Sequence, residues 1–434
     1  MKNKPALGWA ALLIISFLPA IVWYILRPNP HGLSAWGQMT QSIGQLCALI
    51  GMTMFALTFV LSTRWKVVED LFDGLDKVYV VHSIIGASAL VLILFHPIFL
   101  VLKFIPNHVK KAALYLMPST FWSVNFGIIA ILGLIFLIYL TMYTKIKYNH
   151  WKMSHRFLGI VFIFAVLHIF LVRGTASRDN IFAGYYVYAT IVSLIGLACF
   201  AYTQIAHVPG VRDAMYKVET IEKKGKGICE ITIQPVYKPI KYDSGQFIFL
   251  RFFNKDIGSE SHPFTIASKT NDAKIKVVVK DLGDFTKKLE LIKAGERVAV
   301  EGPYGRFNPK AQCEQIWIAG GIGITPFLGM AEDIKENKCR VDLYYSVRSR
   351  DELIESEKLR RIEKETKNRF KMIPWISSEQ GRITVDIISE KSKGFKQKQV
   401  FICGPSGFKR EMSKNLMEAG VQKDNIHEEE FSFR

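Results

Sequence analysis

The first half of the chain is dominated by long apolar segments, whereas the second half alternates short apolar and polar runs. Six segments are long and apolar enough to cross a bilayer, which takes about 20 such residues. They cover residues 7–26, 43–61, 75–104, 119–143, 151–172 and 184–205. The pattern predicts a six-helix transmembrane bundle over residues 1–207, followed by soluble domains.

The second half contains two kinds of alternation. Between residues 211 and 309, short alternating strands are separated by turns, which predicts a small antiparallel β-barrel. Over residues 310–434 the pattern becomes strand, helix, strand, beginning with EQIWIAGGIGITPFLG. That order predicts an α/β nucleotide-binding domain. The fold class expected is therefore a multidomain membrane protein with these three parts.

Two of the apolar segments each contain two histidines. The third segment contains His82 and His96, fourteen positions apart, and the fifth contains His155 and His168, thirteen apart. An imidazole is costly in hydrocarbon and usually marks function there. Fourteen positions of a helix span roughly 20 Å. Two parallel helices would therefore pair His82 with His155 at one depth and His96 with His168 at the other.

Paired imidazoles of this kind predict two stacked bis-histidine haems. A lone metal ion fits less well, because no Cys, Asp or Glu ligand lies near the four histidines in the sequence. The spacing of thirteen presents a difficulty, since it misses the original helix face by about 140°. A tightened turn or a different rotation of that helix must compensate.

The net charge of +18 is shared between both halves of the chain. It is not gathered in an arm, so we expect no nucleic-acid partner. Basic residues near the N-terminus and the even-numbered connections place those ends, and the soluble domains, in the cytoplasm of a multi-pass protein of the cell membrane. They are Lys2, Lys4, Arg64, Lys66, Lys77, Lys145, Lys147, Lys152 and Arg156. Lys103, Lys110 and Lys111 oppose this orientation.

Two further features bear on the cellular location. The first apolar segment follows Met-Lys-Asn-Lys and could be a signal peptide or an anchor. Its long apolar run and the lack of a small-x-small cleavage site favour an anchor. The six cysteines form no CxxC pair, which fits reduced domains that face the cytosol.

Glycine-rich turns follow strands of the last domain. Gly320, Gly321 and Gly323 lie between an apolar strand and a helix that begins at Thr325 and Pro326. Glycine lets a backbone approach a ligand closely, and a helix start can bind phosphate. Because ligands of such sheets bind at the carboxyl ends of strands, this turn predicts a nucleotide site.

Two other segments carry similar signals. Cys403, Gly404 and Pro405 end a later strand of the same domain, so they belong to the same edge of the sheet. Gly283 and Thr286 open a short helix in the barrel domain, where a phosphate can meet free N–H groups.

Five motifs occur in one order: HPFT, GPYG, GGIGITPF, CGP and a phenylalanine near the C-terminus. In this order they resemble the ferredoxin–NADP reductase type of dehydrogenase. Joined to six helices with the four-histidine spacing, residues 40–434 resemble the NADPH oxidase and ferric reductase family. The resemblance implies electron transfer from NAD(P)H through FAD and two b-type haems, an inner and an outer one, to an acceptor outside.

The same resemblance implies roles for individual residues. Those expected to hold the flavin ring and ribityl chain are His262, Pro263, Phe264 and Thr265, in place of the Arg-x-Tyr-Ser of soluble reductases. Those expected to meet the pyrophosphate are Gly283 and Thr286. Those expected to position the dinucleotide are Gly320, Gly321, Gly323, Thr325, Pro326, Gly404 and Pro405, with Cys403 near the nicotinamide.

An aromatic side chain near the C-terminus is expected to cover the flavin. Phe431 in EEEFSFR is our choice, Phe433 is its rival, and in an alternative interpretation both pack against the barrel. Cys403 and Phe431 are thus the residues expected to act directly at the reacting rings.

Arginines at the end of the second strand of the last domain bear on the choice between NADPH and NADH. The strand runs into SVRSRDEL, which places Arg348 and Arg350 near the expected adenosine ribose. Arginine suits the 2′-phosphate of NADPH, so we expect a preference for NADPH, carried mainly by Arg348. The alternative is that both arginines are solvated and partnered by Asp351 and Glu352.

The leading functional hypothesis is a membrane NADPH oxidase that reduces O2 to superoxide. A ferric-chelate reductase with the same cofactors, or an electron donor to an extracytoplasmic partner protein, is the close alternative. A six-helix transporter or proton channel would leave the flavin motifs unexplained. Since no regulatory segment is visible, we expect no obligatory regulatory partner.

Overall fold

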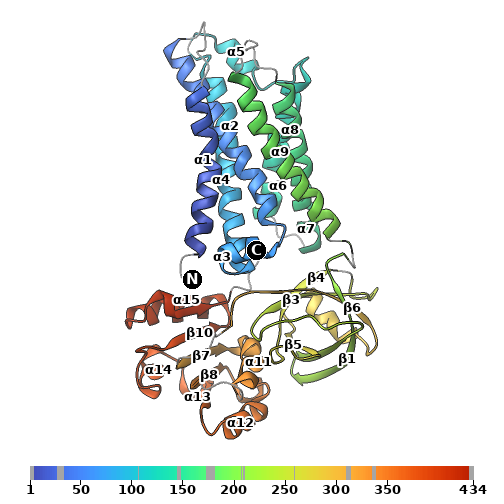
Figure 1. Cartoon of the computed structure of the whole chain (residues 1–434), viewed down its shortest axis with the longest axis vertical. Helices are drawn as coiled ribbons and strands as arrows, with labels where there is room; N and C mark the ends of the chain where they lie inside the picture. The colour runs from blue at the N-terminus through green and yellow to red at the C-terminus, as the bar shows by residue number, and fades with distance from the viewer. Residues whose placement is uncertain are drawn as a thin grey trace. The chain divides into compact units, whose positions relative to one another are not determined.

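The chain forms two compact units, Met1–His207 and Val208–Arg434, drawn as ribbons in Figure 1. The computed structural model describes residues 4–26, 34–105, 107–143, 148–172, 181–206, 208, 211–258, 260–308, 314–334 and 339–429. The first unit is helical, and the second contains two β-sheets with their own helices.

The helical unit confirms the six expected spans: six stretches of its described part are long and apolar enough to cross a membrane. The helices are α1 (Lys4–Leu26), α2 (Ala35–Leu61), α4 (Leu75–Leu102), α6 (Trp122–Tyr143), α7 (Tyr148–Arg156) continued by α8 (Leu158–Leu171), and α9 (Ile181–Ala206). Two short helices, α3 (Lys66–Phe72) and α5 (Val109–Leu114), lie between them. Helix α2 begins earlier than expected because the Ser34 hydroxyl accepts a hydrogen bond from the Gly37 N–H and caps it.

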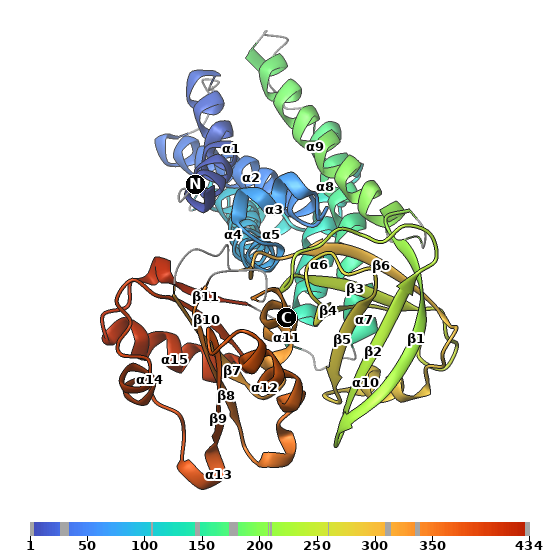
Figure 2. The same ribbon diagram turned by 60° about the horizontal axis from the view of Figure 1, so that its bottom comes forward.

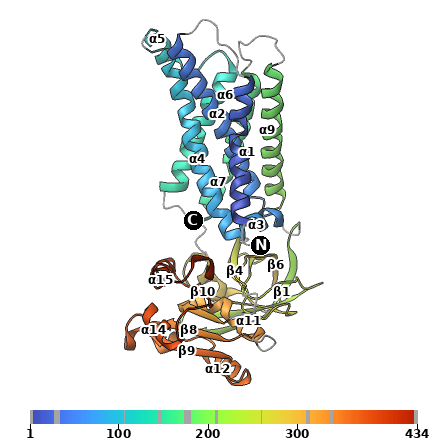
Figure 3. The ribbon, with the colours of Figure 1, turned by 60° about the vertical axis from the view of Figure 1, so that its left-hand side comes forward.

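The long helices run side by side in one bundle, with α2 along α4 (Figure 3) and α6 along α8 (Figure 1). Small residues allow the close approach. A Cβ at Gly159 would lie 2.1 Å from the ring of Phe200, and one at Gly196 would lie 2.5 Å from the ring of Phe162. Glycine at helix contacts is typical of membrane bundles.

The fifth span is interrupted at Phe157, between α7 and α8. The Phe157 N–H donates to the Ser154 carbonyl (3.1 Å), and the Ile160 N–H donates to the Phe157 carbonyl (2.9 Å). Both are i→i+3 bonds, the pattern of a tightened 3₁₀-type turn. The turn lies between His155 and His168, where the spacing of thirteen requires a compensating change.

The first sheet of the second unit is antiparallel, in the order β4-β3-β6-β1-β2-β5. Its strands are β1 (Ala214–Gly225), β2 (Ile228–Pro235), β3 (Phe247–Phe252), β4 (Ser261–Thr265), β5 (Ile275–Lys280) and β6 (Arg297–Tyr304). Ile266 pairs with Val277 next to the two edge strands, β4 and β5, so the sheet curls towards a barrel. The short helices α10 (Asp284–Lys288) and η1 (Leu289–Leu291) follow β5.

The second sheet is parallel, in the order β11-β10-β7-β8-β9. Its strands are β7 (Gln315–Gly320), β8 (Val341–Val347), β9 (Phe370–Ile376), β10 (Gln399–Cys403) and β11 (Ile426–Glu428). The helices between them are η2 (Gly321–Ile324), α11 (Thr325–Asp333), η3 (Arg350–Glu352), α12 (Ser356–Glu365), α13 (Ser377–Gln380), α14 (Val385–Lys391), α15 (Ser406–Glu418) and η4 (Lys423–Asn425).

Helices cover both faces of the parallel sheet (Figure 2). On one face, Trp317 and Leu343 pack with Phe327 of α11 and Leu359 of α12. On the other, alternate strand residues pack against α14 and α15. Because the sheet is covered twice, its strands are apolar on both sides, and this confirms the α/β part of the expected fold class.

Candidate functional site

The histidines of the helical unit meet in two pairs. The rings of His82 on α4 and His155 on α7 have centres 6.0 Å apart, and those of His96 on α4 and His168 on α8 have centres 6.4 Å apart. A ring nitrogen binds a first-row metal at about 2 Å, so two imidazoles that share one metal have centres about 6 Å apart. The separations therefore suit one metal between the rings of each pair.

Three of the four rings have a fixed orientation. The Nδ1 atoms of His82, His96 and His168 lie 3.1, 2.9 and 2.7 Å from the main-chain oxygens of Thr58, Gly44 and Ser123. A carbonyl oxygen only accepts, so each Nδ1 carries the proton and donates it. In a neutral ring the lone pair is then on Nε2, the tautomer that a metal needs.

His155 differs from the other three. Its buried Nδ1 has no hydrogen-bond partner among the residues that the structure describes. The ring instead stacks on Trp151, with centres 5.4 Å apart and planes inclined by 14°, and the Trp151 indole N–H donates to the Thr141 carbonyl. Stacking therefore orients this ring where the others use a backbone oxygen.

Helix α6 supports the His96–His168 pair through a glycine. A Cβ at Gly127 would lie 2.7 Å from Nδ1 of His168, closer than real contacts allow. Only glycine at this position leaves room for the ring while Ser123, one helical turn earlier, accepts its hydrogen bond.

The four residues expected to hold the flavin lie on β4, at an edge of the antiparallel sheet. The His262 ring stacks on Phe285, with centres 3.7 Å apart, and its Nε2 lies 3.1 Å from a carboxylate oxygen of Glu260. Phe264 lies 6.4 Å from the same Phe285 ring. The stretch therefore presents aromatic surface at the sheet edge, which suits a flat ring system.

Gly283 and Thr286 lie at the start of α10, and there the threonine side chain already binds backbone. Its Oγ accepts hydrogen bonds from the N–H groups of Leu282 (2.9 Å) and Gly283 (3.0 Å). A Cβ at Gly283 would meet nothing within 4 Å, so the place is open. Two of the N–H groups at this helix start are thus occupied by Thr286 itself.

The residues expected to position the dinucleotide come together at the carboxyl edge of the parallel sheet. Strands β7 and β10 are neighbours, with Ala319 opposite Cys403. A Cβ at Gly323 would lie 2.3 Å from the Cys403 carbonyl oxygen, so only glycine allows the two segments to meet. Gly321 has φ +55° and nothing within 4 Å of its Cβ position, which leaves a backbone surface open for a ligand.

The other residues of this edge frame the same turn. Thr325 and Pro326 begin α11 and are buried. Gly404 approaches the backbone of Gly320, at 3.2 Å for a Cβ, and Pro405 precedes α15. The structure thus brings all of the expected dinucleotide residues of this domain to one edge.

Cys403 is fully buried at the end of β10. Burial raises the pKa of its thiol, the Glu429 charge raises it further, and Lys409 lowers it. The side chain is therefore a neutral thiol at physiological pH. Such a group can pack beside a bound ring but is a poor nucleophile.

The two arginines after β8 differ in their surroundings. Arg350 makes two hydrogen bonds to the Glu379 carboxylate, at 2.8 and 2.9 Å. That carboxylate raises the pKa of Arg350 and has its own pKa lowered. Arg348 is exposed, and among the described residues its contacts are made by the backbone: its N–H donates to the Glu352 carboxylate and its carbonyl accepts from the Ser378 N–H.

Some site residues were not predicted from the sequence, and two predicted ones lie outside the part of the chain that the structure describes. Phe431 and Phe433 lie outside the described residues. The carbonyls of Thr58, Gly44 and Ser123 were not anticipated, because a backbone acceptor leaves no mark in the sequence. Phe285 was not singled out either, although its place between Gly283 and Thr286 in DLGDFT was a possible signal.

Comparison with known families matches three parts of the chain. Residues 47–166 match the ferric reductase like transmembrane component. Residues 214–308 match an FAD-binding domain, and residues 317–414 match the oxidoreductase NAD-binding domain.

Individual relatives match somewhat less than half of the chain. The ferredoxin reductase component of 3-ketosteroid-9-alpha-monooxygenase from Mycolicibacterium smegmatis is 30% identical over 198 residues, 44% of this chain and 56% of that protein. Ferric reductase transmembrane component 3 of Saccharomyces cerevisiae is 23% identical over 215 residues, 48% of this chain and 28% of that protein. The chain spans about half the length of the first curated relatives it matches.

Among solved structures, a flavohemoglobin from Malassezia yamatoensis with bound FAD and heme aligns with 92% of this chain and 100% of its own. Its identity is 19% and its TM-score 0.50, so the likeness concerns the fold alone. The three matched domains follow one another along the chain. By that order, the chain matches the architecture of the NADPH oxidase and ferric reductase family.

Proposed function

We propose that the chain is a membrane oxidoreductase that transfers electrons from cytosolic NADPH, with FAD and two b-type haems, to an acceptor on the outer side of the membrane. We take O2 as the acceptor, with superoxide as the product. The matched transmembrane, FAD-binding and NAD-binding domains support electron transfer from NAD(P)H.

The observation that carries the proposal is the geometry of the two histidine pairs. Ring centres 6.0 and 6.4 Å apart leave room for one metal each. Three of the rings have Nδ1 bound to a backbone oxygen, which directs Nε2 towards a metal. His82 with His155 would therefore hold one haem, and His96 with His168 the other, each histidine supplying a ring nitrogen to the iron.

The second unit would supply the flavin and nucleotide sites. The β4 residues 262–265 would hold the flavin ring, and the turn Gly321–Ile324 with Cys403, Gly404 and Pro405 would hold the dinucleotide. Gly283 and Thr286 are proposed to face the pyrophosphate, and Arg348 the 2′-phosphate. When bound, flavin accepts a hydride and releases single electrons, which haem iron can carry.

A specific observation favours a second acceptor. The similarity to a yeast ferric reductase component supports a ferric-chelate reductase with the same cofactors. Electron delivery to an extracytoplasmic partner protein is a third outcome of the same test.

The test is spectroscopic and uses the full chain purified in detergent. We expect two b-type haems per chain by the pyridine haemochrome method, and haem reduction on anaerobic addition of NADPH. His96→Ala and His168→Ala should each lose one haem while NADPH still reduces the flavin. Full haem content in either variant would contradict the assignment of that pair.

The acceptor is decided by comparing air with anaerobic ferric chelate. Superoxide formed in step with NADPH oxidation, and abolished by His168→Ala, supports the oxidase. Faster turnover with ferric chelate than with O2 supports the reductase. Haem reduction without turnover on either acceptor would point to a partner protein.

A further inference from the structure

Helix α11 follows β7 of the parallel sheet and also packs against the antiparallel sheet of the second unit. It begins directly after the glycine turn Gly321–Ile324 and ends at Asp333. Nine residues at 1.5 Å each make a rod about 13.5 Å long. A contact that fixes the far end of this rod therefore also fixes the turn at its start.

The middle of α11 lies against the backbone of the antiparallel sheet. A Cβ at Gly329 would lie 2.3 Å from the Ser268 carbonyl oxygen and 3.3 Å from the Ala267 carbonyl carbon. Ser268 lies three residues after Thr265, the last residue of β4. The segment that leaves the proposed flavin strand thus rests directly on the helix that starts the proposed nucleotide turn.

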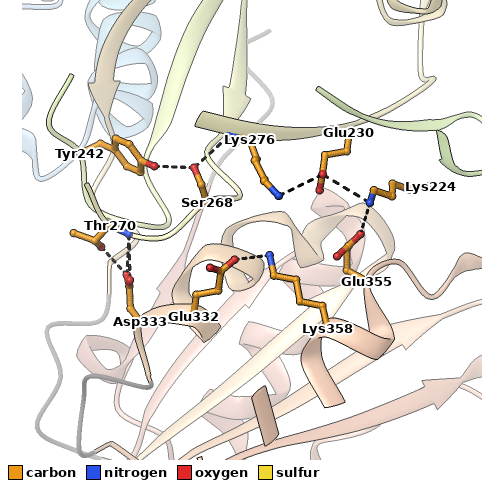
Figure 4. Close-up of polar contacts among 10 residues, drawn as sticks. All are labelled: Lys224, Glu230, Tyr242, Ser268, Thr270, Lys276, Glu332, Asp333, Glu355 and Lys358. Carbon is orange, nitrogen blue, oxygen red and sulfur yellow. Dashed lines mark hydrogen bonds and ion pairs between the residues drawn. The ribbon is translucent and has the colours of Figure 1, made fainter. Parts of the chain in front are cut away.

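The end of α11 is joined to the same segment by a carboxylate, as Figure 4 shows. Oδ1 of Asp333 accepts the Thr270 N–H at 3.1 Å, and Oδ2 accepts the Thr270 hydroxyl at 2.6 Å. Oδ2 also accepts the Ser244 hydroxyl at 2.6 Å. Hydrogen bonds to an ionised acceptor are among the strong ones, so these three bonds resist displacement of the helix end.

The receiving segment is itself held in place within the antiparallel sheet. The buried hydroxyls of Ser268 and Tyr242 lie 2.7 Å apart, and Ser268 Oγ accepts the Lys276 N–H at 3.2 Å. Burial raises the pKa of Tyr242, so the phenol remains protonated and able to bond. Asp333 therefore forms its hydrogen bonds with a segment that is itself hydrogen-bonded within the antiparallel sheet.

A second polar contact between the two sheets' domains lies beside the first. Lys224 of β1 binds the Glu355 carboxylate at 2.8 Å and lies 3.8 Å from Glu230. These carboxylates raise the pKa of Lys224, against the effect of its partial burial. In contrast, Glu332, next to Asp333, pairs at 2.5 Å with Lys358, a residue of its own α/β half.

We propose that Asp333 is a positioning residue that sets the distance between the nucleotide turn and strand β4. The proposal rests on the proposed function, because the step it serves is hydride transfer from NADPH to flavin. In that step a nicotinamide C–H bond breaks and its hydrogen moves with two electrons to the flavin, leaving NADP⁺. Reacting atoms must approach to about 3–3.5 Å, and a misplacement of about 1 Å can cost 10²-fold in rate.

The experiment measures anaerobic flavin reduction in the full chain at increasing NADPH, normalised to bound FAD. Asp333→Ala should lower the limiting rate about tenfold or more and change the NADPH concentration for half-maximal rate far less. The deuterium isotope effect on steady-state turnover, with NADPH deuterated at the transferred position, should rise. Glu332→Ala removes a comparably short contact at the same helix end, made with Lys358 of the same α/β part, and should match wild type.

Milder variants keep the test decisive if Asp333→Ala does not retain FAD. Thr270→Val and Ser244→Ala each remove one hydroxyl donor and should slow flavin reduction less than Asp333→Ala. Asp333→Asn should restore part of the rate, because hydroxyl groups can rotate to bond an amide.

The outcomes separate the two proposals. If NADPH does not reduce the wild-type flavin, the proposed function fails and the positioning role fails with it. If wild type reacts but Asp333→Ala, or both hydroxyl variants, keep its limiting rate and isotope effect, the positioning role alone is overturned. Equal slowing by Glu332→Ala would also overturn it, since the effect would then not depend on the contact between the two sheets.

Discussion

At the scale of single residues, the surroundings of Arg348 and Arg350 separate two arginines that look alike in the sequence. The Arg350 guanidinium donates two hydrogen bonds to the Glu379 carboxylate. The exposed Arg348 guanidinium has no such partner among the described residues. A planar guanidinium can bind phosphate through two hydrogen bonds at once. The sequence suggested both arginines, and the ion pair with Glu379 could not be seen there because 29 positions separate its members.

We expect Arg348→Ala to raise the KM for NADPH several-fold and to leave the KM for NADH nearly unchanged, because only NADPH carries the 2′-phosphate. Steady-state kinetics with both nucleotides provide the measurement. Arg350→Ala is the matched control and should affect neither value much. Equal losses for both nucleotides in Arg348→Ala would show that this side chain does not bind the phosphate.

The C-terminal aromatic residues carry a prediction of their own, although they lie outside the described residues. An aromatic ring on the flavin adds roughly 0.5–1.5 kcal/mol beyond burial. Phe431→Ala should therefore weaken FAD retention and reduce the discrimination between NADPH and NADH, as measured by bound FAD after gel filtration and by kinetics. Phe433→Ala is the control, and the opposite ranking would assign the role to Phe433.

At the scale of elements, most helices and strands follow from the apolar pattern, and the exceptions have physical reasons. Strand β9 contains Pro374, and a proline argues against a central strand. The strand lies at the edge of the sheet, next to β8 only, where a missing N–H is tolerated. Much of β1 is charged and exposed, so its alternation is weak, and it is paired on both sides by β2 and β6.

In an ideal helix, the thirteen-residue spacing between His155 and His168 would place the two side chains on different faces. The interruption at Phe157 changes the rotation between α7 and α8, and the structure brings both histidines opposite their partners on α4. Periodicity could reveal that a compensating change was needed. It could not locate the turn, because neither Arg156 nor Phe157 is a glycine or a proline, the residues that usually mark a break in a helix.

The contact between α6 and α8 gives a prediction at this scale. Gly127→Ala would place a methyl group 2.7 Å from Nδ1 of His168, so the ring must turn and lose its bond to the Ser123 carbonyl. We expect loss of the haem of that pair, with the other haem retained, as measured by haem content and reduced-minus-oxidised spectra. Gly86→Ala, whose Cβ would meet Thr58 at an ordinary 3.8 Å, is the control. Equal haem content in both variants would contradict this role of Gly127.

At the scale of the whole molecule, the order of parts was predictable because a bilayer, a barrel and a parallel sheet impose different periodicities. The contacts that join the two sheets of the second unit were not predictable. Thr270 and Asp333 are 63 positions apart, and neither is unusual in its own segment. A single polar pair at such a separation leaves no periodic signal.

The final prediction concerns regulation. We expect the purified chain to oxidise NADPH in detergent or lipid when only FAD, haem and an acceptor are supplied, because the chain itself contains the matched transmembrane, FAD-binding and NAD-binding domains. Acceptor-dependent NADPH oxidation is the measurement. Addition of a calcium chelator is the control and should have no effect. A protein that is silent until an ion or a second protein is added would disprove the expectation.

The backbone acceptors of the histidine rings have a consequence for evolution and engineering. The oxygens at Thr58, Gly44 and Ser123 belong to the main chain, so replacing the side chain of Thr58 or Ser123 leaves the acceptor itself in place. Sequence drift at these positions can therefore alter packing without changing the chemical partner of a ring. A designer who wants to retune the His82 or His168 ring must therefore act on its surroundings, such as Gly127 beside His168, because changing the side chain of Thr58 or Ser123 leaves the accepting oxygen in place.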